Sequence, residues 1–283
     1  MPFARKTKHS SAPDNPQLRM LHRVRESGDR QFVAALARGL AILRCFRSGD
    51  RYLGNQEIAR RTGLAKPTVS RLTHTLTRVG FLSHSPLREE YALGAGVLAL
   101  GHAYLAALNT RELARPMMQE VADFAKATIS LGENDGQHMV IVEICHGSPT
   151  YRLRLDVGQR VPHNTTALGR AYLAAMSPEQ RAQRVDSICR SLQPAAARAK
   201  LHAEIHSSLR NFDKQGFVYS FGDWNPEVFA VGVPLISVDR TRVMALSCSG
   251  AMFDVTRKKL VTEYGPRMVA LRDRIYEAAR GVF

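Results

Sequence analysis

A short pattern centred on Gly63 constrains this chain more than any other feature of the sequence. Apolar residues at helical spacing lie on both sides of it, in a short segment over 55–61 and a longer one over 66–79. Gly63 suits a turn whose backbone geometry other residues resist, and Pro67 falls where the first turn of a helix tolerates proline. The sequence therefore predicts two helices joined by a tight turn, a helix-turn-helix.

The segment before this pattern predicts a further helix. Apolar side chains recur there at three- and four-residue steps, as on one face of a helix, at Phe32, Leu36, Leu40, Leu43 and Phe46. Asn55 is expected to be the N-cap of the first helix of the pair, because its side chain can accept a hydrogen bond from a free backbone N–H. These helices would share one small core.

The segment after the pattern predicts a β-hairpin. Residues 81–84 and 91–93 have the composition of short strands, and the polar segment 85–90 lies between them. A hairpin of this size behind a helix-turn-helix is typical of a wing. We therefore expect residues 30–93 to form a mainly α-helical winged helix-turn-helix domain.

The solvent face of the longer helix carries hydroxyls and cations, which suit phosphates and base edges in a major groove. Arg88 at the hairpin tip could reach the minor groove or a phosphate, although Glu89 and Glu90 beside it oppose that role. The alternative is an ordinary three-helix bundle with a polar face. The predicted DNA-contacting residues are Gln56, Lys66, Pro67, Thr68, Ser70, Arg71, His74 and Arg88.

The charge of the chain also favours a polyanionic partner. The formal net charge is +15, and residues 1–100 hold 17 Lys and Arg against 7 Asp and Glu. Neutralising phosphates with such side chains releases counterions and drives binding to double-stranded DNA. Residues 1–29 lack hydrophobic periodicity and are expected to be a disordered basic tail. The alternatives are a solubilising basic surface and a nonspecific nucleic-acid-binding protein that depends on this tail.

Cysteine usage and hydropathy indicate a cytoplasmic protein. The four cysteines, Cys45, Cys145, Cys189 and Cys248, show no paired spacing, which suits a reducing compartment. The longest apolar stretch, residues 92–108, is interrupted by glycines and is too short to span a bilayer. No membrane partner is expected.

The remainder of the chain predicts a second domain of the α+β class. A linker helix is expected over 94–112, ending before Pro116, and the second domain over 113–283. Strand-like runs that cluster as hairpins, with helices elsewhere, indicate an antiparallel sheet. The expected strands are 128–133, 139–145, 151–155, 217–221, 229–235 and 243–248, and the expected helices are 117–126, 167–175, 178–190, 197–213 and 256–280.

The segment over 163–169 offers a candidate ligand site. It leads into a helix, and the start of a helix presents free backbone N–H groups and a partial positive charge to a carboxylate. Simple capping of the helix by Thr165 or Thr166 is the alternative reading of these residues.

Enzymatic chemistry finds little support in the sequence. Cys145 and His146 are neighbours on a predicted strand, so their side chains point to opposite faces and cannot form a catalytic pair. His202 and His206 lack the paired cysteines of a zinc site. We expect no cofactor, no metal and no catalytic residue; an enzyme using the second domain is the remaining alternative.

Several motifs resemble the IclR family of transcriptional regulators in order and spacing over about residues 30–280. A family member is expected to bind DNA through the winged domain and a small molecule through a GAF-like C-terminal domain, as a dimer or a tetramer. The opening segments 27–29 and 37–40 are similar to the branch that controls aromatic-acid catabolism. The motifs lie at 37–43, 57–64, 67–72, 80–82, 91–94, 157–162, 166–171 and 246–250.

The resemblance also implies which residues hold the effector. Ser220 stands where members often have an aspartate, and Ala230 replaces a cysteine found in some sensors of small acids. Trp224, the only tryptophan, lies in the same loop, so the pocket suits an aromatic or apolar acid better than a very small one. Ordinary core packing is the alternative role for Trp224. The implied residues are Thr165, Thr166, Ala167, Leu168, Gly169, Ser220, Asp223, Trp224, Ala230, Ser247 and Ser249.

Overall fold

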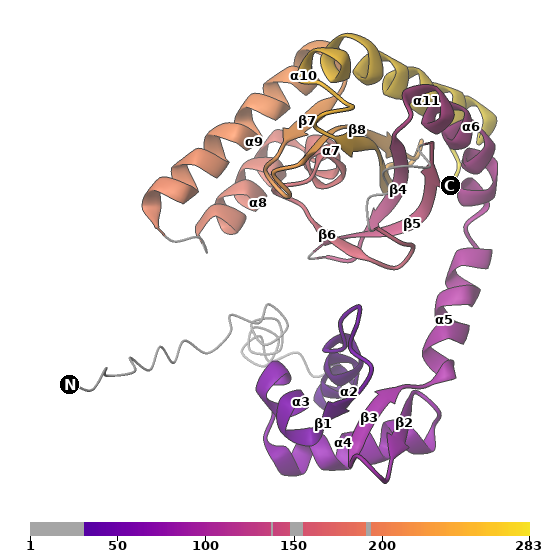
Figure 1. Cartoon of the computed structure of the whole chain (residues 1–283), viewed down its shortest axis with the longest axis vertical. Coiled ribbons are helices and arrows are strands. Elements are labelled where there is room, and N and C mark those ends of the chain that lie inside the picture. Colours follow the sequence, from indigo (N-terminus) through magenta and orange to yellow (C-terminus); the bar gives the residue numbers. More distant parts are fainter. Residues whose placement is uncertain (1–30, 137, 148–154, 191–193) are drawn as a thin grey trace. The chain divides into compact units, whose positions relative to one another are not determined.

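The computed structural model describes residues 31–136, 138–147, 155–190 and 194–283. The chain divides into two compact units, one ending at Ala103 and the other covering Tyr104–Phe283 (Figure 1). The predicted basic tail over 1–29 lies outside the described residues, as does nearly all of the strand predicted over 151–155.

The N-terminal unit has the predicted helix-turn-helix and hairpin. Ile42, Ile58, Val69 and Leu82 are buried together and form its small core. A two-residue strand that the sequence did not predict joins the hairpin, so the sheet has three strands in the order β1-β3-β2. The elements are α2 (Ala34–Arg44), β1 (Leu53–Gly54), α3 (Asn55–Thr62), α4 (Lys66–Arg78), β2 (Leu82–Ser85) and β3 (Glu90–Leu93).

Two local predictions in this unit need correction. Of the apolar face predicted for the first helix, Leu43 and Phe46 pack against the core. Leu36 and Leu40 are 63% and 47% exposed, because α2 packs inward through Ala41 and Ile42 instead. The N-cap of α3 is Gly54, which is extended because it pairs with β3, and it makes no side-chain cap. Asn55 is the first helical residue, and its Oδ1 accepts a hydrogen bond from the Thr73 hydroxyl at 3.3 Å.

The linker region forms two helices whose boundary differs from the prediction. α5 (Ala95–Ala106) ends earlier than expected, and α6 (Asn109–Ala125) continues through Pro116. A proline inside a helix removes one backbone hydrogen bond. Burial of Ala114 and Met118 on either side of Pro116 explains why the helix continues, since both side chains are fully buried.

The second unit is built on one antiparallel sheet of six strands in the order β6-β5-β4-β9-β8-β7. This confirms the α+β prediction, with most strands one or two residues longer than expected and a short additional one, β6. The strands are β4 (Thr128–Asn134), β5 (His138–His146), β6 (Arg160–Pro162), β7 (Val218–Phe221), β8 (Val228–Ile236) and β9 (Val243–Ala251).

Helices cover both faces of this sheet (Figure 1). Alternate residues of β9 divide between two cores: Leu246 and Cys248 pack with α6 and α11, whereas Ala245 packs with α7, α8 and α9. The second face, covered by α7, α8 and α9, is therefore the one that also receives Ser247 and Ser249. The covering helices are α7 (Ala167–Ala174), α8 (Pro178–Arg190), α9 (Ala195–Gln215) and α11 (Gly265–Ala278).

The last helix differs from the single helix predicted over 256–280. It comprises α10 (Arg257–Lys259), a π-helical turn η1 (Leu260–Tyr264) and α11. A Cβ at Gly265 would lie 2.4 Å from the Phe217 ring, so the helix packs directly against that ring. Leu260 and Tyr264, at the two ends of the π-helical turn, are both buried.

All four cysteines are buried and free. Among the described helices, none has both the length and the apolar character needed to cross a membrane. The described part of the chain likewise contains no group of three or more ligating side chains arranged for a metal ion.

Candidate DNA-binding surface and effector pocket

The solvent face of α4 brings several of the predicted DNA-contacting residues together. Lys66, Ser70, Arg71 and His74 are exposed, and the helix contains no acidic residue. Residues three and four positions apart lie on one side of a helix, so these side chains form a continuous hydroxyl and cation surface. Pro67 is also exposed, and Thr68 is half-buried at the edge of this surface.

The opposite face of α4 fixes the helix in the domain. Val69 and Thr73 are fully buried, and the Thr73 hydroxyl donates to the Val69 carbonyl oxygen at 3.0 Å as well as to Asn55. Gly63 ends α3 with φ of +66°, the left-handed conformation that the predicted turn requires. This geometry leaves the α4 surface facing solvent.

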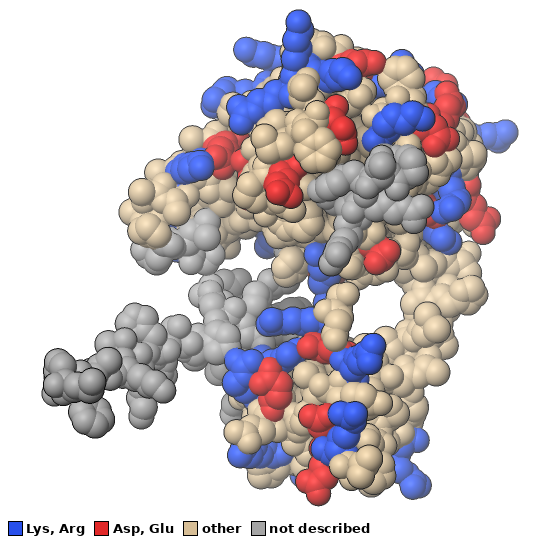
Figure 2. Space-filling model, viewed as in Figure 1, with Lys and Arg blue, Asp and Glu red and all other residues tan. Residues whose placement is uncertain are grey.

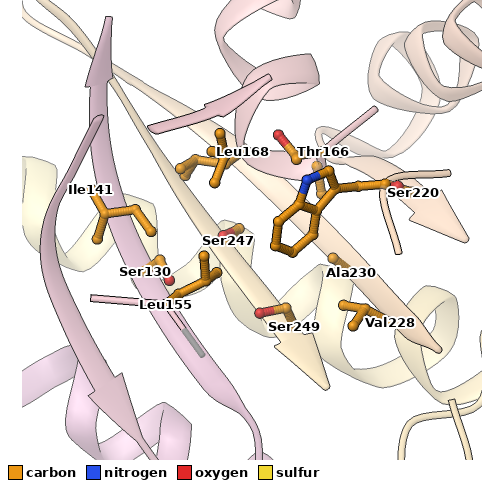
Figure 3. A pocket seen from close by; sticks show the side chains of 13 residues that line it. Ser130, Ile141, Leu155, Thr166, Leu168, Ser220, Val228, Ala230, Ser247 and Ser249 are labelled. Carbon is orange, nitrogen blue, oxygen red and sulfur yellow. The ribbon is translucent and has the colours of Figure 1, made fainter. Parts of the chain in front are cut away.

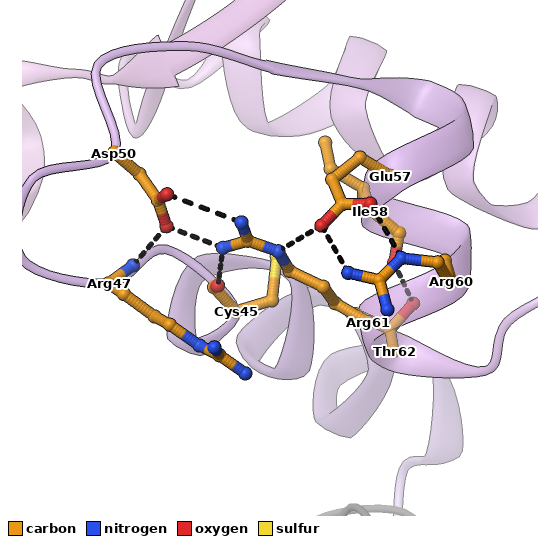
Figure 4. A network of polar contacts seen from close by, with 8 residues as sticks. All are labelled: Cys45, Arg47, Asp50, Glu57, Ile58, Arg60, Arg61 and Thr62. Atoms are coloured by element: carbon orange, nitrogen blue, oxygen red, sulfur yellow. Dashed lines mark hydrogen bonds and ion pairs between the residues drawn. The ribbon is translucent and has the colours of Figure 1, made fainter. Parts of the chain in front are cut away.

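A network of ion pairs ties α3 to the end of α2 (Figure 4). The Arg61 guanidinium donates to the Asp50 carboxylate at 2.5 Å, to Glu57 at 2.6 Å and to the Cys45 carbonyl oxygen at 3.1 Å. Arg60 donates to Glu57 at 2.6 Å. The two arginines of α3 are therefore engaged within the protein, a pairing that the sequence alone did not reveal.

We expect Arg61→Ala to destabilise the N-terminal unit by about 2 kcal/mol, because it leaves Asp50 and a backbone carbonyl without their charged donor. Arg60→Ala is the matched control, since its side chain is 61% exposed and exposed ion pairs contribute little. Urea unfolding of both variants measures the difference. Equal stability of the two variants would contradict a structural role for Arg61.

The network also predicts acid sensitivity. Hydrogen bonds from Arg60 and Arg61 lower the pKa of Glu57 from 4.5 to about 2, and a hydrogen bond from Arg61 lowers the pKa of Asp50. A lowered pKa in the folded state means that this stabilisation is complete above pH 4.5 and is lost as the pH falls towards 2. Unfolding followed between these pH values should therefore show a weaker pH dependence in Arg61→Ala.

The wing places Arg88 at the exposed turn between β2 and β3. Its guanidinium lies 5.2 Å from the centre of the Tyr52 ring, which precedes β1. The strands pair in register from Leu82 with Leu93 to Ser85 with Glu90, so the turn lies at the free end of the hairpin. Gln56, in the first turn of α3, is exposed as well.

Net charge does not locate the DNA-binding surface by itself. Figure 2 shows basic and acidic side chains interspersed on the visible face of the N-terminal unit, and a denser basic group around α10 in the other unit. The three residues of α10 are all basic. The local composition of α4, rather than the total charge, therefore distinguishes the predicted surface.

The second unit contains a mainly apolar pocket between the sheet and the start of α7 (Figure 3). Its volume is about 40 Å³, room for only a few water molecules. Eight of the eleven residues that the resemblance implied lie around it. The lining residues are Ser130, Ile141, Leu155, Val161, Thr166, Ala167, Leu168, Ser220, Trp224, Val228, Ala230, Ser247 and Ser249.

Glycines in the sheet let α7 begin directly over it. A Cβ at Gly232 would lie 2.6 Å from the Ala167 carbonyl oxygen, and one at Gly132 would lie 2.7 Å from the Leu168 side chain. A Cβ at Gly169 would lie 2.3 Å from the Cα of His163, in the segment that precedes the helix. The first residues of α7 therefore form one wall of the pocket.

The pocket hydroxyls differ in whether the protein already uses them. Thr166 caps α7: its hydroxyl accepts from the Gly169 N–H at 3.0 Å and donates to the Pro162 carbonyl oxygen at 2.6 Å, as the capping alternative predicted. Ser220 donates to the Thr165 carbonyl oxygen at 2.6 Å, and Ser249 to the Thr128 carbonyl oxygen at 3.4 Å. The buried Ser130 hydroxyl has no partner among the described residues.

Three of the implied effector residues do not line this pocket. Gly169 is packed against backbone, whereas Thr165 and Asp223 border a separate open cavity of about 700 Å³ beside α9. Asp223 forms an ion pair at 2.7 Å with Arg170, which is completely buried in α7. The loop that carries Trp224 is thus attached to α7 through the neighbouring residue, an interaction that sequence reasoning missed.

Other pocket residues that sequence reasoning missed come from the half of the sheet formed by β4, β5 and β6. Ser130 and Ile141 belong to β4 and β5, and Leu155 precedes β6. The alternation of side chains along a strand could have shown which face of β4 carries Ser130. It could not have shown that β4 pairs with β9, which brings Ser130 beside Ser247.

Comparison with known proteins identifies both units. The family model for the IclR helix-turn-helix domain matches residues 35–86, and the model for the C-terminal domain of bacterial transcriptional regulators of the IclR type matches residues 102–273. The chain belongs to the IclR family. It is accordingly a DNA-binding transcriptional regulator with a C-terminal effector-binding domain, and the relatives named below are regulators rather than enzymes.

Individual relatives resemble the IclR-family chain over most of its length. A crystal structure of an IclR-family regulator from Brucella abortus is 40% identical, with a TM-score of 0.82, covering 89% of this chain and 95% of that one. The regulator TsaQ1/TsaQ2 of Comamonas testosteroni is 29% identical over 92% of this chain and 90% of its own length. An IclR homologue from Microbacterium hydrocarbonoxydans, solved with 4-hydroxybenzoate, is 20% identical and shares the fold, with a TM-score of 0.68 over 87% of this chain and 99% of that one.

Proposed function

We propose that this IclR-family regulator binds an aromatic carboxylic acid in the pocket beside α7, and that binding changes its affinity for a specific operator. The observation that carries the proposal is the pocket itself, in which apolar side chains and Trp224 face the start of a helix. The first-turn N–H groups of α7 favour a carboxylate, and the apolar lining favours a ring. The homologue solved with 4-hydroxybenzoate is consistent with this class of ligand.

The pocket must enlarge to admit such an acid, because ligand pockets usually measure about 300–1,000 Å³ and this one measures about 40 Å³. Trp224 lies in the irregular segment between β7 and β8, and its side chain is 39% exposed. It is the only residue of the pocket lining that is classed as exposed, so we propose that the pocket opens there. Because Asp223 is paired with Arg170, displacement of Trp224 would also act on α7.

We further propose that Lys66, Ser70 and Arg71 read base edges in a major groove and that His74 and Arg88 contact the DNA backbone. These residues are exposed on α4 and the wing, and α4 contains no Asp or Glu, which supports this assignment. Gln56, Pro67 and Thr68 would complete the contact surface around the start of the helix. Affinity for the operator would then exceed affinity for random DNA.

We also propose that the functional regulator is at least a dimer. The twelve residues of α5 include no charged side chain, and none of them is buried within the chain. Leu98 and Leu100 are 75% and 61% exposed. A helix that is apolar on all sides is normally covered, so a second copy of the chain is the expected partner of α5.

Tryptophan fluorescence tests the proposed effector class. Because Trp224 is the only tryptophan and lines the pocket, benzoate-type acids should change its emission, whereas glyoxylate and pyruvate should not. Trp224→Phe, measured by calorimetry, shows whether the acids still bind when the reporter is absent. A response to the two small acids but not to benzoates would overturn the proposal.

A further inference from the structure

The open cavity beside α9 has the size that the pocket beside α7 lacks. Its volume is about 700 Å³, within the range of about 300–1,000 Å³ that is usual for sites of small organic ligands. The pocket beside α7 measures about 40 Å³. The cavity can therefore hold a whole organic molecule in the structure as it stands.

The cavity is separate from the pocket, although the two share a wall. Thr165 and Asp223 border the cavity, whereas the residues that follow them in the chain, Thr166 and Trp224, line the pocket. The Ser220 hydroxyl donates to the Thr165 carbonyl oxygen at 2.6 Å and joins the two segments of this wall. A ligand in the cavity would thus contact the opposite side of the segments that enclose the pocket.

The charged side chains that line the cavity are not balanced. Arg170 pairs with Asp223 at 2.7 Å, and Lys200 pairs with Glu204 at 3.8 Å. Arg257 is the remaining charged residue of the lining, and it forms no ion pair with any residue that the structure describes. The cavity therefore carries one cation without a carboxylate partner, which favours an anionic ligand.

Two aromatic rings hold this free cation beside the cavity. The guanidinium carbon of Arg257 lies 5.0 Å from the centre of the Phe221 ring and 5.4 Å from the centre of the Phe229 ring. Such contacts position a guanidinium while its N–H groups stay available to an acceptor. Phe221 also stacks on Tyr219, with 4.5 Å between the ring centres, so the rings that carry Arg257 are themselves supported by the sheet.

A second donor borders the cavity from within the domain. Arg170 is completely buried, and its Nε and Nη1 donate to the carbonyl oxygens of Asn164 and Tyr219 at 2.9 and 2.8 Å. Its Nη2 has no partner among the described residues. A buried N–H group without a partner is costly. Because Arg170 lines the cavity, an oxygen acceptor bound there would supply the missing partner.

We infer that this cavity is a second ligand site, for an organic anion that carries an apolar body. The anionic group accepts hydrogen bonds from Arg257 and from the unpaired Nη2 of Arg170. The apolar body contacts Ala197 and Leu201 of α9 and the Phe221 ring, which all line the cavity. The site is independent of the acid proposed for the pocket beside α7, since no residue lines both.

Fluorescence titration with two matched dyes tests the inference. The probes are 8-anilinonaphthalene-1-sulfonate and N-phenyl-1-naphthylamine, which has the same rings without the sulfonate, each added to the full-length protein. We expect the sulfonate to bind about tenfold more tightly than the neutral dye, the effect of one hydrogen bond to a charged group. Arg257→Gln should abolish that preference. Lys258→Gln, which changes the exposed neighbour outside the cavity lining, is the matched control and should retain it.

A second pair of variants tests where the dyes bind. Ala197 and Ala199 are both exposed residues of α9, but only Ala197 lines this cavity. Ala197→Phe should weaken the binding of both dyes by about tenfold, because the ring occupies the apolar surface that they contact. Ala199→Phe should leave both affinities unchanged. All four substituted residues are exposed, so the variants should keep the fold.

The results that overturn the inference differ between the two pairs of variants. If the dyes bind equally, or if Lys258→Gln removes the preference as Arg257→Gln does, Arg257 holds no anion and the inference is wrong. If Ala197→Phe leaves both affinities unchanged, the dyes bind elsewhere, such as on the apolar surface of α5, and the inference is also wrong. A preference lost only in Arg257→Gln, with binding weakened only by Ala197→Phe, establishes the second site.

Discussion

Arg71→Ala should weaken binding to a specific operator by about 1–3 kcal/mol, or roughly 5- to 150-fold, while changing binding to random DNA much less. Arg71 is exposed in the second turn of α4, on a helix that contains no acidic residue. A guanidinium can donate two parallel hydrogen bonds to one guanine, and alanine leaves those acceptors unpaired.

The control for Arg71 is an arginine outside the DNA-binding domain. Arg190→Ala in α8 removes the same charge and should leave the ratio of specific to random binding unchanged. Fluorescence anisotropy with both duplexes at several salt concentrations measures that ratio. If both variants show the same small decrease in affinity for both duplexes, the total charge governs binding and Arg71 reads no base.

Leu98→Glu should dissociate the regulator and lower its operator affinity by about 100-fold or more. A carboxylate on α5 would be buried between two copies of the chain without a partner, which is strongly unfavourable. Loss of the dimer removes the advantage of two linked DNA-binding domains, typically about 10² to 10⁴ in affinity. Sedimentation velocity shows the dissociation and anisotropy shows the lost affinity.

Val282→Glu is the matched control for this substitution. Val282 is 76% exposed, close to the 75% of Leu98, but it lies at the other end of the chain in the C-terminal unit. It should leave both the sedimentation coefficient and the operator affinity unchanged. A Leu98→Glu protein that sediments like the wild type would contradict the role proposed for α5.

The helix-turn-helix could be located from the sequence because its signals are local. Gly63 adopts the left-handed conformation that its turn position predicted, and Pro67 lies in the first turn of α4. Five of the six strands of the second unit, all except β6, were also placed to within three residues at each end, because turn residues lie near their ends. Elements of two or three residues, such as β1, carry no periodic signal and depend on pairing with a distant strand.

The candidate site was only partly predictable for the same reason. The start of the helix at 165–169 was indicated by the sequence itself as well as by the family resemblance, whereas the residues between 220 and 230 came from the resemblance alone. Ser130 was missed because its place in the pocket depends on the pairing of β4 with β9, more than 100 residues away in the chain. The ion pair between Arg170 and Asp223 depends likewise on tertiary structure, and it assigns Asp223 to the attachment of the Trp224 loop.

The phase of an amphipathic helix also depends on tertiary contacts. The spacing placed Leu36 and Leu40 on one apolar helix face with Leu43, but α2 packs through Ala41 and Ile42 and leaves Leu36 and Leu40 exposed. A helical period can be read from the sequence, whereas the face that becomes buried depends on the neighbouring helices. With Leu98 and Leu100, these exposed leucines add to the apolar surface of the N-terminal unit.

The central claim is that DNA reading and acid sensing are coupled in one protein, and one titration tests it. Anisotropy is measured with a duplex from the region upstream of the protein's own gene and with a scrambled duplex, with and without 4-hydroxybenzoate. We expect a clear preference for the native duplex and a change of about 5- to 150-fold in that affinity when the acid is added. Equal, steeply salt-dependent binding to both duplexes, unaffected by the acid, would contradict the claim and favour nonspecific binding through basic residues.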